Sequence, residues 1–60
     1  MREAEIHDYA RQLWEARGAK AVAEAAQKAC RFEQKGEDGQ AKTWRQIEAA
    51  LKLMRGPNAS

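Results

Sequence analysis

The sequence predicts a small all-α protein of three helices, and composition, apolar periodicity and glycine placement support this prediction. Thirteen of the 60 residues are alanine, and many others are Glu, Gln, Lys or Arg, which also favour helix. The β-branched residues are too few and scattered for strands: Ile6, Val22, Thr43 and Ile47. We expect helices at about 3–17, 20–35 and 38–55, in a single domain over residues 1–55 with a flexible tail at 56–60.

The first predicted helix has an apolar stripe at helical spacing, and glycine follows it. The stripe consists of Ile6, Tyr9, Ala10, Leu13 and Trp14. Gly18 then favours a helix end. At roughly 100° per residue, this stripe and the one containing Val22, Ala25, Ala29 and Phe32 are out of phase by more than a third of a turn. We therefore prefer a turn near Gly18, and one long helix over residues 3–35 is the alternative.

The second predicted helix has an apolar side made mostly of alanine, which lets neighbouring helices approach closely. Its central residues are Ala25, Ala26 and Ala29. Because the bulky residues lie on the flanking helices, we expect this helix to be the middle layer, receiving Trp14 and Trp44 from its two sides.

The Gly36-Glu37-Asp38-Gly39 segment separates the second helix from the third. We expect Gly36 to end one helix in the left-handed conformation and Asp38 to cap the next. Thr43 begins a possible capping box, so a later start is an alternative. The third helix has the strongest apolar stripe: Ala41, Trp44, Ile47, Leu51 and Met54. Gly56-Pro57 is expected to stop it.

The second and third predicted helices together, over residues 22–54, resemble a single tetratricopeptide-like hairpin. The resemblance rests on Ala29, Phe32, Gly36 at the turn and Ala41. It departs from that pattern at Glu48, where the family has an alanine, and the chain has no second repeat. The resemblance implies a binding or scaffolding role without catalysis. More generally, the chain is similar to short, uncharacterised helical proteins of bacteria.

The residues that carry catalysis or metal binding are scarce. His7 and Cys30 are the only histidine and cysteine, and they stand at unrelated positions, so we expect no enzyme, no cofactor and no metal site. We interpret Cys30 as a core or boundary residue, with a reactive thiol as the alternative. No segment has the apolar length of a membrane span or a signal peptide, and the single cysteine fits a reducing compartment. The expected location is cytoplasmic, and no small-molecule substrate is indicated.

The large apolar side chains are few for an independent domain: Ile6, Tyr9, Leu13, Trp14, Val22, Phe32, Trp44, Ile47, Leu51, Leu53 and Met54. A domain of this size without a disulfide or metal needs very good packing or a partner chain. Leu53 lies nearly opposite Leu51 on the third helix, so Ala49 and Leu53 are the candidate protein-interaction residues. The sequence therefore predicts a non-enzymatic interaction or regulatory module, with a second copy of the chain (a homodimer) or another protein as its partner. A two-helix hairpin that dimerises into a four-helix bundle is a further alternative.

A row of basic residues on the second helix gives a second hypothesis, a weak nucleic-acid-binding accessory protein. The candidate residues are Lys20, Lys28, Arg31 and Lys35. Glu24 interrupts the row and is expected to pair with Lys20 and Lys28 at i, i+4 spacing. The simpler interpretation is a solvated helix face, since the net charge is only +2.

Overall fold

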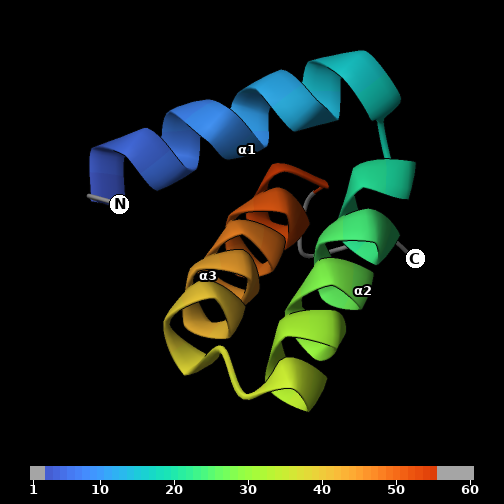
Figure 1. The fold of residues 1–60 in the computed structure, drawn as a ribbon. Helices are drawn as coiled ribbons and strands as arrows, with labels where there is room; N and C mark the ends of the chain where they lie inside the picture. The colour runs from blue at the N-terminus through green and yellow to red at the C-terminus, as the bar shows by residue number, and fades with distance from the viewer. Residues whose placement is uncertain (1–2, 56–60) are drawn as a thin grey trace.

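A computed structural model describes residues 3–55, which form three helices (Figure 1). Helix α1 spans Glu3–Arg17, α2 spans Lys20–Lys35 and α3 spans Asp38–Arg55. These bounds confirm the predicted all-α fold and its three helices. The tail and the stop at Gly56-Pro57 lie outside the described residues.

Helices α2 and α3 run side by side in opposite directions, and α1 lies across them (Figure 1). Helix α1 packs more extensively on α3 than on α2. The expectation that α2 is the middle layer is therefore wrong, because α3 contacts both other helices extensively. The reason is steric: α3 carries the two large, fully buried side chains, Ile47 and Leu51, and these fill the centre of the bundle.

Gly18 separates α1 from α2. Its φ angle is +62°, a left-handed conformation that glycine adopts without a Cβ penalty. Its N–H donates to the carbonyl of Trp14 at 2.7 Å, and its own carbonyl accepts from Ala21 at 3.0 Å. Residue 19, an alanine, is the N-cap residue of α2 and makes no side-chain capping hydrogen bond. The hydrogen bonds at the start of α2 are therefore made between backbone groups. The single-helix alternative is wrong.

Gly36 ends α2 in the left-handed conformation, as predicted, with φ of +79°. Its N–H donates to Glu33 at 3.1 Å, and the N–H of Glu37 donates to Phe32 at 2.9 Å. This pair of bonds is a Schellman motif. Asp38 is the first residue of α3, so it stands within the first turn, where its charge suits the helix dipole, and the residue before it occupies the capping position.

The alternative start of α3 at Thr43 is also wrong. The Thr43 hydroxyl donates to the Gly39 carbonyl at 3.1 Å inside the helix. This is the i−4 bond that threonine makes within a helix and not an N-cap bond.

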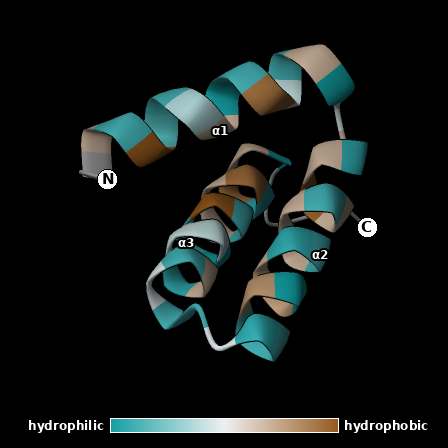
Figure 2. Cartoon of the chain, viewed as in Figure 1, coloured by the Kyte–Doolittle hydropathy of each residue, from teal (hydrophilic) through white to brown (hydrophobic). Residues whose placement is uncertain are grey.

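The core is small and rich in alanine. Its buried residues are Ile6, Ala10, Ala21, Ala25, Ala29, Ala41, Ile47, Ala50 and Leu51. On α2 the buried alanines are therefore 21, 25 and 29, while Ala26 and Val22 are only half-buried. The most hydrophobic segments of α3 lie in the half nearest α1 (Figure 2). Over residues 3–55, no helix has the length and apolar character needed to cross a membrane.

Candidate functional site

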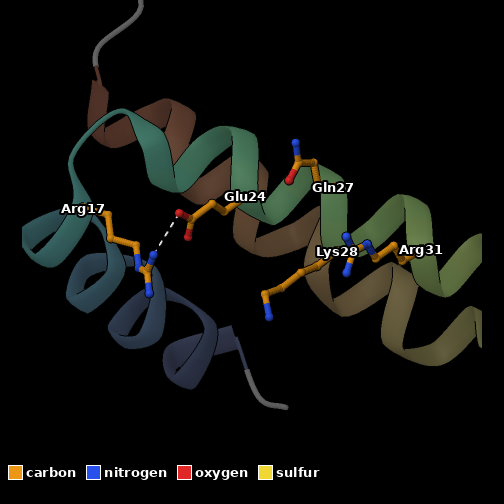
Figure 3. Close-up of a pocket in the computed structure, with 5 residues that line it drawn as sticks. All are labelled: Arg17, Glu24, Gln27, Lys28 and Arg31. Atoms are coloured by element: carbon orange, nitrogen blue, oxygen red, sulfur yellow. Dashed lines mark hydrogen bonds and ion pairs between the residues drawn. The ribbon is translucent and has the colours of Figure 1, made fainter.

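A basic pocket lies where the end of α1 meets α2. It has a volume of about 300 Å³ and is lined by Arg17, Glu24, Gln27, Lys28 and Arg31. In Figure 3 the Arg17 side chain extends from α1 toward Glu24, and the other three residues follow along α2. The turn at Gly18 makes this possible, since it brings the last residue of α1 beside the second turn of α2. Sequence reasoning found Lys28 and Arg31 but missed Arg17 and Gln27.

The two carboxylates of α2 each pair with an arginine from another helix. Glu24 accepts from Arg17 of α1 at 2.9 Å, and Glu33 pairs with Arg45 of α3 at 3.2 Å. The expected pairs of Glu24 with Lys20 and Lys28 are not formed. Both acids of α2 are therefore compensated by residues outside α2.

The basic row of α2 is consequently left without carboxylate partners. Within residues 3–55, these side chains are exposed and form no ion pair: Lys20, Lys28, Arg31 and Lys35. On a helical projection they occupy one flank of α2, within about a quarter of a turn. The structure thus brings the four predicted residues together as one surface and adds Arg17 at its edge.

Lys28 departs from the expected fully solvated face, because it reaches across to α3. Its Nζ atom lies 5.2 Å from the centroid of the Trp44 ring, within the range of a cation–π contact. Tyr9 of α1 meets the same ring edge-to-face, with centroids 5.7 Å apart and an interplanar angle of 73°. Trp14 and Trp44 are both partly buried and pack against the core.

A second candidate surface is the outward face of α3. Leu53 is 72% exposed, and Ala49 is exposed one turn before it. Both lie on the side of α3 opposite the buried Leu51, as their helical spacing indicates. That a partner molecule covers these two residues stays a prediction.

An ion-pair network lies at the edge of this α3 face. The Glu48 carboxylate accepts from Arg45 at 3.0 Å and pairs with Lys52 at 3.2 Å. Burial alone would raise the pKa of Glu48, but the hydrogen bonds from Lys52 and Arg45 outweigh it and hold that pKa below its ordinary value. The carboxylates of Glu33 and Glu48 together raise the pKa of Arg45.

Cys30 is exposed, so its expected core or boundary position is wrong. The buried side of α2 runs through Ala25 and Ala29, and the next residue points about 100° away from it. The side-chain amide of Gln34 donates a weak hydrogen bond to Sγ at 3.8 Å. His7 is exposed on α1. In the described part of the chain, no three His, Cys, Asp or Glu residues group as metal ligands would.

No family model, curated protein or solved structure is significantly similar to this chain. The resemblance of residues 22–54 to a tetratricopeptide-like hairpin stays a prediction. The fold and the two surfaces define a small three-helix all-α protein with a basic flank on α2 and an apolar strip on α3. Any function proposed for it rests on this geometry.

Proposed function

We propose that this protein is a non-enzymatic interaction module that pairs with a second copy of itself through the outward face of α3. The observation that carries the proposal is incomplete burial. Of the eleven large apolar side chains, only Ile6, Ile47 and Leu51 are buried. The others keep part of their surface in water, and two of them, Tyr9 and Leu53, are exposed.

Leu53 has the largest exposed fraction among the large apolar side chains, so contact with a partner can bury much of its surface. Burying a leucine fully is worth about 1.5–3 kcal/mol, and Leu53 is 72% exposed in the single chain. A two-fold interface repeats that burial in each copy. Ala49, one turn away, is small and exposed, so in the proposed dimer it would allow the leucine of the other copy to approach α3 closely.

The charges beside this strip favour contact between identical surfaces. Arg45, Lys52, Glu33 and Glu48 form one connected network of two cations and two anions. Because the network carries no net charge, it adds no net repulsion when two copies approach along α3. A neutral edge beside an exposed leucine suits a self-complementary interface.

Sedimentation equilibrium over a wide concentration range tests this proposal on the full chain. We expect the native protein to dimerise and Leu53→Glu to be monomeric, because the new carboxylate cannot be buried without a partner. The matched control is Gln34→Glu, which adds the same charge at an exposed position of α2 and is expected to dimerise normally. A folded monomer in all three samples would contradict self-association and would direct the search to a different protein partner.

We also propose that the module works in the cytoplasm. The exposed thiol of Cys30 supports this, because an accessible lone cysteine stays reduced in a reducing compartment and becomes cross-linked in an oxidising one. The proposal of a non-enzymatic role is supported by the placement of His7 on α1 and Cys30 on α2, each exposed to solvent.

A further inference from the structure

We propose that the basic flank of α2, with the pocket at its α1 end, binds the phosphate backbone of a single nucleic-acid strand. The surface is formed by Arg17, Lys20, Lys28, Arg31 and Lys35. It is distinct from the α3 strip and does not depend on self-association. The ligand class follows from the spacing of the charges, from the compensation of nearby acids and from an exposed aromatic ring.

The cations form a row and not a point, which favours a polymer over a small anion. From Lys20 to Lys35 the row extends about 22 Å along the helix axis, at 1.5 Å per residue. A nucleic-acid strand presents phosphates at regular intervals along such a length. A single row on one helix flank suits the backbone of one strand.

The positive field of the row survives the presence of acids on α2. Glu24 and Glu33 are held by Arg17 and Arg45 at 2.9 Å and 3.2 Å. The two arginines thus offset both acids of α2, and within residues 3–55 the four cations of the row form no ion pair of their own. Arg17 also lines the pocket, so phosphate bound there would compete with Glu24 for its guanidinium.

Aromatic residues beside the row favour a single strand over a duplex. Lys28 sits over the Trp44 ring at 5.2 Å, and Tyr9 packs against that ring while remaining 37% exposed. Bases of a single strand are free to stack on an exposed aromatic ring, and those of a duplex are not. The ring contact also orders the Lys28 side chain, which reduces the entropy lost when it binds phosphate.

The same neighbourhood disfavours an anionic membrane surface. A helix that lies on a membrane places apolar side chains beside its basic ones. The exposed residues next to this row on α2 are Ala23, Gln27 and Gln34. The exposed leucine at position 53 belongs to α3 instead.

Fluorescence anisotropy with the full chain and a dye-labelled single strand of about 12 nucleotides tests the proposal. In about 20 mM salt we expect binding, and Lys28→Gln combined with Arg31→Gln should weaken it about tenfold. The matched control, Lys42→Gln with Arg55→Gln, removes equal charge from exposed positions of α3 and should change affinity less than about twofold. Glu24→Gln should tighten binding, because it removes the carboxylate that competes for Arg17.

Salt dependence supplies an independent readout. The slope of log affinity against log salt should fall by about 1.4 in the Lys28–Arg31 double variant, at about 0.7 for each lost contact on a single strand. Equal weakening in the α3 control would overturn the site in favour of diffuse attraction to net charge. Tighter binding of a duplex of the same length would overturn the single-strand assignment, and tighter binding of polyglutamate would favour an acidic protein partner. Absence of binding by the folded native chain at low salt would overturn the proposal entirely.

Discussion

The ammonium group of Lys28 lies 5.2 Å from the centroid of the Trp44 ring. Tyr9 meets the same ring edge-to-face, with the two ring centroids 5.7 Å apart. The three residues belong to α2, α3 and α1 respectively, so the indole of Trp44 is a point at which all three helices join. Aromatic pairs are worth about 0.5–1.5 kcal/mol beyond area burial, and exposed cation–π contacts about 0.5–1 kcal/mol. Trp44 therefore links the basic flank of α2 to the stability of the bundle.

Trp44→Ala should lower the free energy of unfolding by about 2–3 kcal/mol, somewhat less than for a fully buried tryptophan. The variant loses the packing of a half-buried ring and both ring contacts. Trp44→Phe keeps an aromatic ring at the junction and should lose about 1 kcal/mol. Urea unfolding followed by circular dichroism measures both values. A loss below about 1 kcal/mol for Trp44→Ala would show that the junction contributes little.

The helix bounds are predictable from sequence because the signals that set them are local. Gly18 and Gly36 both have positive φ angles, and each ends its helix within a few residues of the apolar stripe before it. The order of the layers is not predictable in this way, because it depends on how bulky side chains fill shared space. On α2 the sequence offers several alanines of equal hydrophobicity, so it does not distinguish the buried Ala21 from the half-buried Ala26. The same ambiguity explains why the sequence wrongly predicts a core or boundary position for Cys30, which is exposed.

The basic site is predictable only in part for a related reason. Four cations at helical spacing are visible in the sequence, because they belong to one helix. The pairing of Glu24 with Arg17 joins residues on two helices, and it depends on the angle of the Gly18 turn. The pairing of Glu33 with Arg45 likewise depends on the register of α2 against α3. The periodicity of residues within one helix therefore cannot predict either of these two ion pairs.

The alanine side of α2 is expected to be sensitive to added volume. Ala25 is fully buried, so Ala25→Leu should lower the free energy of unfolding by about 1–3 kcal/mol through overpacking. Ala23→Leu, two residues away at an exposed position of the same helix, is the matched control and should change stability by less than about 0.5 kcal/mol. Urea denaturation of the two variants provides the comparison. Similar stabilities would mean that α2 does not pack through the side containing Ala25.

The two glycines around the α2–α3 turn should respond oppositely to alanine. Gly36 has φ of +79°, so Gly36→Ala should cost about 1–2 kcal/mol by placing a Cβ in the left-handed region. Gly39 lies in the first turn of α3, and a Cβ there meets no atom within 4 Å. Gly39→Ala should therefore stabilise the protein by about 0.5–1 kcal/mol. Thermal melts should place the two variants on opposite sides of the native midpoint, and a shift in the same direction for both would be inconsistent with this turn.

Glu48 should make stability depend on acid pH. Its folded-state pKa lies below the ordinary value of 4.5, since hydrogen bonds from Lys52 and Arg45 outweigh the effect of burial. A carboxyl with a depressed folded pKa contributes stability that is fully present above the unfolded pKa and is lost as pH falls through the folded pKa. Glu48→Gln should therefore lower the free energy of unfolding by about 0.5–1 kcal/mol at pH near 7, with the difference from the native chain shrinking below pH 4.5.

Urea denaturation of Glu48→Gln and the native chain at neutral and acid pH measures this effect. Glu15→Gln is the control, because the pair of Glu15 with Arg11 is 3.6 Å long and both side chains are mostly exposed. Exposed pairs of this kind contribute little, so the control should match the native chain closely at both pH values. A difference between native and Glu48→Gln that stays constant from neutral to acid pH would show that the glutamine acts through packing, and that the charge of Glu48 does not stabilise α3.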